Sequence, residues 1–262
     1  MLPRCSRNTA SISMTRNKKQ FIITLKNPIN PMKKRFLMVA LATIAVLGAK
    51  AQTNLQMFYD FGRQYVTTTF EMFKGDKWGD TFFFIDHYYT TSDQRTAGQG
   101  SAINGSYFEI ERGLNFWQDS ELKDLSLHVE YDGATWGTGI ASIGAKYFFH
   151  NSNFNNTLSL YAMYDYNTGC PQADIPVKFS AVWDLQDLFG AKGLRFSGFA
   201  DYWGNNSEFG KFSFLTEPQL WYNMACIGVE NLNLGGEVEL SYNFAGYEGF
   251  HCNPCLGIKW AF

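Results

Sequence analysis

Residues 125–132 have the sequence Leu125-Ser126-Leu127-His128-Val129-Glu130-Tyr131-Asp132, in which apolar and polar side chains alternate. Successive side chains of a β-strand point to opposite faces of the sheet, so this alternation of period two predicts a strand. One face of the strand is apolar, and the other carries hydrogen-bonding and charged groups. A half-buried strand of a soluble protein has the same pattern, so the fold depends on how often the pattern recurs.

The alternation recurs along the rest of the chain. We predict twelve strands, most of them eight to eleven residues long, at 54–62, 65–74, 81–90, 106–117, 125–132, 138–150, 158–166, 177–184, 194–201, 212–224, 236–244 and in a last segment that ends at 262. A strand of ~9–11 residues spans a bilayer, and every backbone group in lipid needs a partner. The expected fold class is therefore all-β, a twelve-stranded antiparallel transmembrane β-barrel.

A soluble β-sandwich or lipocalin-like barrel is the alternative fold. The membrane barrel is favoured because the polar faces carry charged residues at mid-strand, because 43 of residues 52–262 are aromatic, and because the chain ends on an apolar strand. Aromatic residues also lie near strand ends, as interfacial girdles require: Tyr59, Trp117, Tyr166, Trp183, Tyr202, Tyr222 and Trp260. We expect outer-membrane lipid around this barrel and recognition of its terminal Phe262 by barrel-assembly machinery.

The first 51 residues differ from the rest in charge. They hold ten of the 22 basic residues and none of the 24 acidic ones, so residues 52–262 carry a formal charge of −12. The basic Met32-Lys33-Lys34-Arg35, an apolar run at 36–48 and the small residues of Ala49-Lys50-Ala51 follow the order of a secretory signal peptide. That run is short of the ~20 residues of a spanning helix. We predict a mis-assigned upstream extension at 1–31, a signal peptide at 32–51 cleaved after Ala51, and the barrel at 52–262.

The polar faces of the strands predict a lumen with charges of both signs. In one interpretation these charges only solvate and brace a narrow water-filled barrel. In the other, flat rings beside carboxylates bind a flat heterocycle with a hydroxylated sugar, while the excess of acid disfavours anions. The predicted charged set is Asp86, Glu109, Glu111, Glu130, Asp165, Asp201, Glu217, Glu237, Glu239, Lys146, Lys178, Arg195 and Lys259, and the aromatic set is Phe84, Tyr88, Tyr107, Phe148, Tyr161, Phe199 and Trp221.

Four cysteines follow the predicted cleavage site. With both ends of the barrel on the periplasmic side, the connections 91–105, 133–137, 167–175, 203–211 and 245–251 are expected to face outwards. Cys170 lies in one of them, and Cys252-Asn253-Pro254-Cys255 opens the last strand at the same side. Because that compartment is oxidising, we predict a loop-stapling disulfide among Cys170, Cys252 and Cys255, with free thiols as the alternative. The spacing completes no zinc site, and we expect no metal and no cofactor.

A lipid-modifying barrel enzyme is the rival class of function. Such enzymes use Ser and His at the membrane boundary, and Ser126, His128, His87 and His150 are the available residues. None of them lies in a recognisable nucleophile motif, and the chain has no phosphate loop and no nucleotide-binding glycine pattern. We therefore expect no enzymatic activity and no nucleic-acid partner, and we interpret His128 as a solvated lumen residue.

Three short motifs resemble the nucleoside-specific channel-forming porins of the Gram-negative outer membrane. They are Glu71-Met72-Phe73, the run Trp78-Gly79-Asp80-Thr81-Phe82-Phe83-Phe84, and Phe108-Glu109-Ile110-Glu111-Arg112, with the terminal aromatic strand in addition. The family's Glu-Ile-Glu-Pro-Arg pattern is altered here, since Arg112 has no Pro beside it.

The resemblance covers most of residues 52–262 and implies a monomeric barrel that passes nucleosides by diffusion through weak sites. It adds Phe82 and Arg112 to the predicted pore-lining residues and supports Phe84, Glu109 and Glu111. The expected function is thus a narrow, substrate-selective channel. The alternative is a barrel without a transport role, either a structural or surface protein or a lipid-modifying enzyme.

Overall fold

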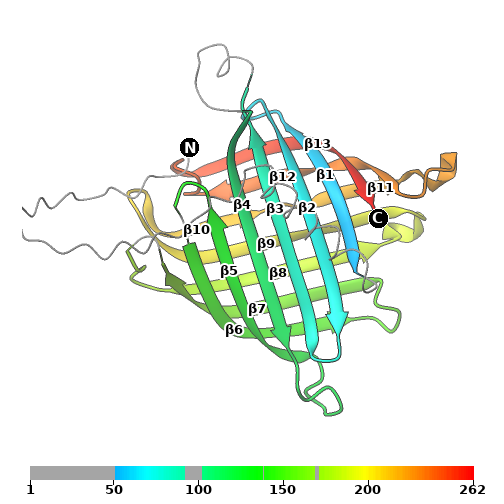
Figure 1. Ribbon diagram of the computed structural model, residues 1–262, viewed down its shortest axis with the longest axis horizontal. Coiled ribbons are helices and arrows are strands. Elements are labelled where there is room, and N and C mark those ends of the chain that lie inside the picture. Colours follow the sequence, from blue (N-terminus) through cyan, green and yellow to red (C-terminus); the bar gives the residue numbers. More distant parts are fainter. Residues whose placement is uncertain (1–50, 92–101, 138, 169–170) are drawn as a thin grey trace, which may run out of the picture. The chain divides into compact units, whose positions relative to one another are not determined.

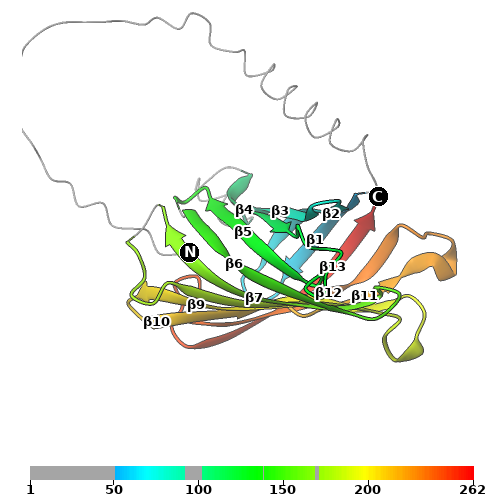
Figure 2. The ribbon, with the colours of Figure 1, turned by 90° about the horizontal axis from the view of Figure 1, so that it is seen from below.

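The computed structural model describes residues 51–91, 102–137, 139–168 and 171–262. These residues form an all-β fold in which the strands join in a single antiparallel sheet (Figures 1 and 2). The predicted extension at 1–31 and the signal peptide up to Lys50 lie outside the described residues, as do 92–101 of one predicted loop. No helix of the described segments is long and apolar enough to cross a membrane.

The strands follow one another around the sheet almost in chain order. Their bounds are β1 Gln52–Asp60, β2 Tyr65–Asp76, β3 Gly79–Tyr89, β4 Ile103–Leu114, β5 Leu125–Ala134, β6 Gly139–His150, β7 Asn156–Asn167, β8 Val177–Gln186, β9 Leu194–Ser207, β10 Gly210–Thr216, β11 Gln219–Asn223, β12 Leu232–Tyr242 and β13 Phe250–Ala261. Two short 3₁₀ turns, Leu188–Gly190 and Met224–Ile227, lie in the β8–β9 and β11–β12 connections, at the end of the barrel where β1 starts and β13 ends.

Strands β10 and β11 are two halves of one strand. Both pair with β9 on one side and with β12 on the other, so the 13 segments fill twelve positions. The interruption is Glu217-Pro218, where proline has no N–H to donate to a neighbouring strand. The backbone N–H of Glu217 still donates to the carbonyl of Phe199 at 3.2 Å, so the wall continues across the break. The predicted number of strands is confirmed.

The last strand closes the sheet on the first. β13 pairs with β12 over its whole length and with β1 from Asn54↔Ala261 to Asp60↔Cys255. The backbone groups of both strands therefore find partners on either side, and the described sheet has no free edge. A closed sheet of this kind avoids the unpaired backbone groups that neither lipid nor a dry interior tolerates.

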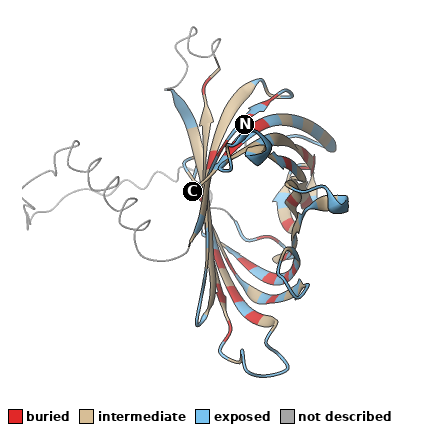
Figure 3. Ribbon diagram, turned by 90° about the vertical axis from the view of Figure 1, so that its right-hand side faces the viewer, coloured by how far each residue is buried: buried red, intermediate tan, exposed pale blue. Residues whose placement is uncertain are grey.

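The two faces of the barrel wall differ in chemistry, as the alternation predicts. On β5, Leu127 and Tyr131 point outwards and are 39% and 40% exposed, whereas His128, Glu130 and Asp132 point inwards and are 0%, 7% and 4% exposed. The same alternation of buried and exposed residues follows the strands around the barrel (Figure 3). The core of this protein is thus the polar interior of the barrel, and its apolar side chains form the outer surface.

One predicted loop is wrong. Residues 203–211, expected as an external loop, form a hairpin in which Ser207 pairs with Gly210 and Trp203 with Ser213. The Asn-rich sequence belongs to the wall because its inward side chains are paired: Asn205 Nδ2 donates to Ser213 Oγ at 2.8 Å, and Ser213 Oγ donates to the carbonyl of Asn243 at 2.7 Å. The alternation of inward and outward side chains on β9 therefore continues beyond residue 201, where the predicted strand ended.

Candidate functional site

Almost all predicted lining residues face the barrel interior. The registers of adjacent strands place Phe84 opposite Glu109 and Glu111 opposite Glu130, and the same faces continue around the wall. The residues that point inwards are Phe82, Phe84, Asp86, Glu109, Glu111, Glu130, Lys146, Lys178, Arg195, Glu217, Trp221 and Glu239. Phe82 was assigned to the lining by the family resemblance, and alternation along the strands assigned the others.

Arg112 is the exception and does not line the interior. It lies opposite Thr81 and Val129, both on the outer face. Its guanidinium donates to both carboxylate oxygens of Asp76 at 2.9 Å and to the Thr81 hydroxyl at 2.9 Å. Arg112 follows the inward Glu111 by one residue, so the period of two turns it outwards, where it braces the turn between β2 and β3.

Five donor groups converge on the inner face of β4 and β5, and we call them the β4–β5 cluster: Glu109, Glu111, His128, Glu130 and Asp132. Their register makes Glu111 the neighbour of Glu130 and Glu109 the neighbour of Asp132. His128 Nε2 lies 3.4 Å from a carboxylate oxygen of Glu111 and 3.4 Å from one of Glu130. The prediction that His128 is solvated is wrong, because the residue is fully buried and packs edge-on against Tyr161.

Two lysines, Lys146 on the adjoining strand β6 and Lys178 on β8, supply cations to this level of the barrel. Lys178 Nζ lies 2.5 Å from Glu130 Oε1 and 3.8 Å from both Asp132 and Asp201. Lys146 Nζ donates to Asp80 Oδ1 at 2.8 Å. Both lysine side chains are buried, and Lys178 reaches two of the cluster's four carboxylates, those of Glu130 and Asp132.

Aromatic rings line the wall beside the cluster. Phe82, Phe84 and Tyr107 form a row, with ring centroids 6.0 Å and 5.7 Å apart. The Tyr107 hydroxyl donates to Glu109 at 3.1 Å. The row of rings therefore ends beside a carboxylate. Together they offer a flat apolar surface and a hydrogen-bond acceptor.

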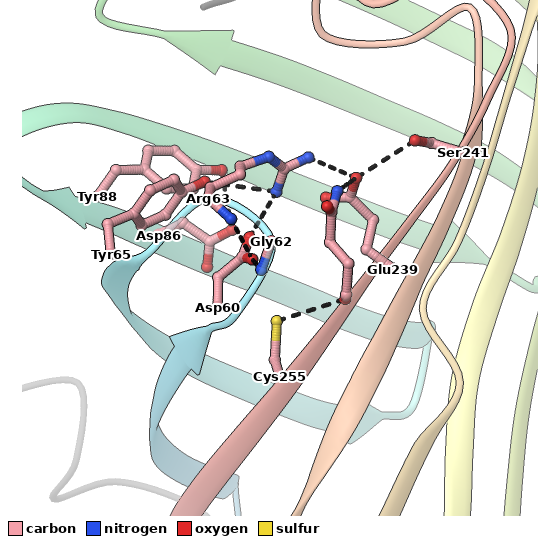
Figure 4. Close-up of polar contacts among 10 residues, drawn as sticks. Asp60, Gly62, Arg63, Tyr65, Asp86, Tyr88, Glu239, Ser241 and Cys255 are labelled. Atoms are coloured by element: carbon pink, nitrogen blue, oxygen red, sulfur yellow. Dashed lines mark hydrogen bonds and ion pairs between the residues drawn. The ribbon is translucent and has the colours of Figure 1, made fainter.

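A second polar group, at the end of the barrel opposite to the start of β1 and the end of β13, is organised by Arg63 (Figure 4). Asp60 Oδ1 accepts the backbone N–H groups of Gly62 and Arg63 at 2.7 and 2.8 Å, which folds the β1–β2 turn tightly. The Arg63 guanidinium then points into the barrel, bridging Asp60 at 3.1 Å and Glu239 on β12. Burial opposes its charge, but Glu239 and Asp60 outweigh this cost and raise the pKa of Arg63 above its ordinary value.

Sequence analysis missed Arg63. It stands in a turn, where the alternation that identifies inward residues on strands does not apply. The available signal was Asp60 three residues earlier, since an aspartate that caps a turn and a following arginine are within ion-pair reach.

Near the end where β1 begins and β13 finishes, side chains fill the barrel. Trp221 and Phe58 pack with ring centroids 5.6 Å apart, and Lys259 Nζ lies 4.3 Å over the Trp221 ring. Trp221 and Phe58 are 1% and 3% exposed. Arg195, also inward, pairs with Asp184 through two hydrogen bonds of 2.6 and 3.0 Å.

The cysteine prediction is partly contradicted. Cys252 and Cys255 are free thiols and lie inside β13, where the alternation puts Cys252 on the outer face and Cys255 on the inner face. Two side chains on opposite faces of a strand cannot bridge. Cys226 is also free, and Cys170 lies outside the described residues.

The interior as a whole is polar, crowded and acidic. Its buried members include residues of both signs, but carboxylates outnumber cations, and the closest ion pairs leave several carboxylates without a cation of their own. Such a lining favours cations and neutral hydrogen-bonding solutes over anions. The apolar outer face, by contrast, is suited to a lipid environment.

Comparison with known proteins gives a family and a fold. Residues 51–262 match the family model described as "Domain of unknown function (DUF5020)". A search of the curated proteins finds no relative of the chain.

Among solved structures, the barrel is similar to the NanC porin at 10% sequence identity, with 79% of this chain and 98% of that chain covered and a TM-score of 0.52. It is also matched to Omp33 of Acinetobacter baumannii at 10% identity (81% and 97% covered, TM-score 0.37) and to OccK11 of Pseudomonas aeruginosa at 9% identity (81% and 95% covered, TM-score 0.34). The NanC match shows the barrel fold alone.

Proposed function

The chain belongs to the DUF5020 family, and from the lining of its barrel we propose that it is a narrow, substrate-selective diffusion channel of a Gram-negative outer membrane that passes nucleosides. The family description assigns no activity. The proposal is therefore supported by the chemistry of the two faces of the wall and by the arrangement of the side chains inside it.

One observation carries the proposal: aromatic rings and carboxylates adjoin on the same inner face. Phe84 lies 5.7 Å from Tyr107 between ring centroids, and Tyr107 donates to Glu109. A nucleobase stacks on flat rings, while carboxylates accept hydrogen bonds from ribose hydroxyls. The uncharged nucleoside also avoids the repulsion that an acidic lining exerts on anions such as nucleotides.

The outer face supports a location in the outer membrane. Leu55, Met57 and Tyr59 on β1 are 44%, 46% and 42% exposed, and Leu256, Ile258 and Trp260 on the adjoining β13 are 64%, 44% and 43% exposed. A closed barrel with such an apolar face has its backbone groups paired and its side chains suited to lipid. We propose that it works as a monomer and that Phe262 is recognised by barrel-assembly machinery.

The proposed conduit is narrow. The β4–β5 cluster and the Trp221 region are both buried within the barrel, so passage of a nucleoside requires the inner side chains to move aside. Selectivity would follow, because a solute that restores the displaced hydrogen bonds enters at a lower cost than one that does not.

The test is single-channel recording of the refolded protein in planar bilayers, with and without adenosine or thymidine. We expect a current that added nucleoside reduces. In Glu109→Gln and Glu111→Gln the block constant should weaken about tenfold, because losing one charged hydrogen bond costs ~1.5–3 kcal/mol. Asp119→Asn, in an exposed turn, is the matched control and should leave the block unchanged.

A second candidate function is favoured by the burial of the interior. His128 is 0% exposed and Trp221 is 1% exposed, as in a barrel that is braced rather than open. A folded protein without any current would support this candidate, a structural or surface barrel. Loss of lipid turnover in His128→Ala, again without current, would support the enzymatic form.

A further inference from the structure

The β4–β5 cluster has the composition and spacing of a metal site. Glu111, His128 and Glu130 each place a ligand atom within 4.8 Å of the other two, and so do Glu109, Glu130 and Asp132. Glu130 belongs to both triads, so the five side chains form a single donor set. They come from two adjacent strands of a closed sheet, which holds their backbone positions fixed.

Two of the three donor distances in the first triad match the spacing of metal-bound ligands. His128 Nε2 lies 3.4 Å from Glu111 Oε2 and 3.4 Å from Glu130 Oε2. Two donors that bind one ion tetrahedrally at ~2.0–2.1 Å lie about 3.3–3.4 Å apart. An ion among these three atoms thus needs little rearrangement of the triad.

A second, independent observation is an unsatisfied carboxylate oxygen. Asp132 is only 4% exposed, yet its Oδ1 atom has no hydrogen-bond partner. The carboxylate faces Glu109 and Glu130, and the nearest ammonium, that of Lys178, lies 3.8 Å from its other oxygen. A buried oxygen without a partner costs free energy, and a buried charge is normally paired or bound to a metal.

The charge balance points the same way. Four carboxylates of the cluster lie around one closely bound ammonium, since Lys146 is engaged by Asp80. When the carboxylates are ionised, the cluster with Lys178 has three negative charges in excess. A divalent cation removes most of this excess.

We propose that the β4–β5 cluster binds a divalent transition-metal ion, with Glu111, His128 and Glu130 as its ligands and Asp132 and Glu109 as adjacent acceptors. Oxygen donors alone would suit Ca²⁺ or Mg²⁺, whereas the imidazole favours Zn²⁺; Mn²⁺ suits the carboxylate oxygens of the same set. This proposal goes beyond nucleoside passage and does not rest on it. A metal ion at this level would also set the charge that any solute meets in the lumen.

Lys178 gives the proposal a signature that a merely structural cluster lacks. Its ammonium forms an ion pair with Glu130 Oε1, while His128 contacts the other oxygen of that carboxylate, Oε2. The ammonium therefore competes electrostatically with a metal ion for the same carboxylate. Removing it with Lys178→Met should tighten metal binding at least tenfold, the opposite of what disruption of the site would do.

The test is isothermal titration of the detergent-folded, chelator-treated protein with Zn²⁺, Mn²⁺ and Ca²⁺. We expect one equivalent of Zn²⁺ or Mn²⁺ to bind with a Kd that weakens at least tenfold in His128→Gln and in Glu130→Gln, and Ca²⁺ to bind more weakly. His251→Gln is the control, because His251 lies on the inner face of β13 and its Nε2 is 3.0 Å from the carbonyl of Glu248.

Heat-modifiable mobility on gels checks that each variant is folded. Binding that is unchanged in the two cluster variants, or absent from the folded wild type, would overturn the proposal. Absence would mean that protons and Lys178 neutralise the cluster. These outcomes involve no nucleoside, so they are distinct from a failure of the proposed channel function.

Discussion

Arg63 links the β1–β2 turn to the β12 wall, and its replacement by alanine tests how much this link stabilises the barrel. The guanidinium donates to Asp60 at 3.1 Å and to Glu239, whose side chains are 4% and 8% exposed. Arg63→Ala leaves both carboxylates buried without their partner. Breaking a buried pair costs ~3–5 kcal/mol, and because the arginine itself is 20% exposed we expect a loss of about 2–3 kcal/mol in the free energy of unfolding.

Arg112 provides the matched control. It forms an Arg–Asp pair of the same chemistry with Asp76, but on the outer face, with the two side chains 25% and 35% exposed. Arg112→Ala should therefore cost less than about 1 kcal/mol. Arg63→Lys should recover only part of the loss, because one ammonium does not reproduce the fork that reaches two carboxylates.

The assay for these variants is urea-dependent unfolding from lipid vesicles, followed by the fluorescence of the seven tryptophans. The account predicts that the unfolding midpoint falls clearly in Arg63→Ala and only slightly in Arg112→Ala. Equal losses in the two variants would refute the reasoning, since they would mean that burial of the bridge has no energetic consequence.

Three further predictions concern packing, thiols and processing. Gly144→Val should lower the free energy of unfolding by about 1–3 kcal/mol, because an added Cβ would lie 2.0 Å from the carbonyl oxygen of Ala162; Gly75→Ala, with open space around it, is the control, and equal stabilities would contradict the prediction. Alkylation of the denatured protein without reductant should modify both Cys252 and Cys255. If neither is alkylated and the mass is lower by two hydrogen atoms, the two form a disulfide and the prediction is contradicted. Intact-mass measurement of the protein from outer membranes should give a chain that begins at Gln52, whereas peptides from residues 1–31 would contradict the predicted upstream extension.

Strand alternation predicted most of this molecule because a barrel wall has two chemically different sides. On β5, for example, the assignment of Leu127 outwards and Glu130 inwards needed only the period of two. The same rule places Arg112 outwards, beside the inward Glu111, although the family resemblance suggested a lining role. Where the local pattern and the resemblance disagreed, the local pattern was right.

Other features depend on the register between strands, which a single sequence leaves open. The convergence of Glu111, His128 and Glu130 requires β4 and β5 to pair at one offset, and the reach of Lys178 to Glu130 requires the wall to curve across β6 and β7. The Asn-rich hairpin after Trp203 was misassigned because polar strand residues beyond the apolar part resemble a loop.

The most direct test of the central claim, an acid-lined conduit through the barrel, is the reversal potential of the refolded protein in a planar bilayer under a KCl gradient. The account predicts a current that reverses at a potential of the sign for cation selectivity, because carboxylates outnumber cations in the lining. Anion selectivity would contradict the assigned lining, and the absence of any current from correctly folded protein would contradict the conduit itself.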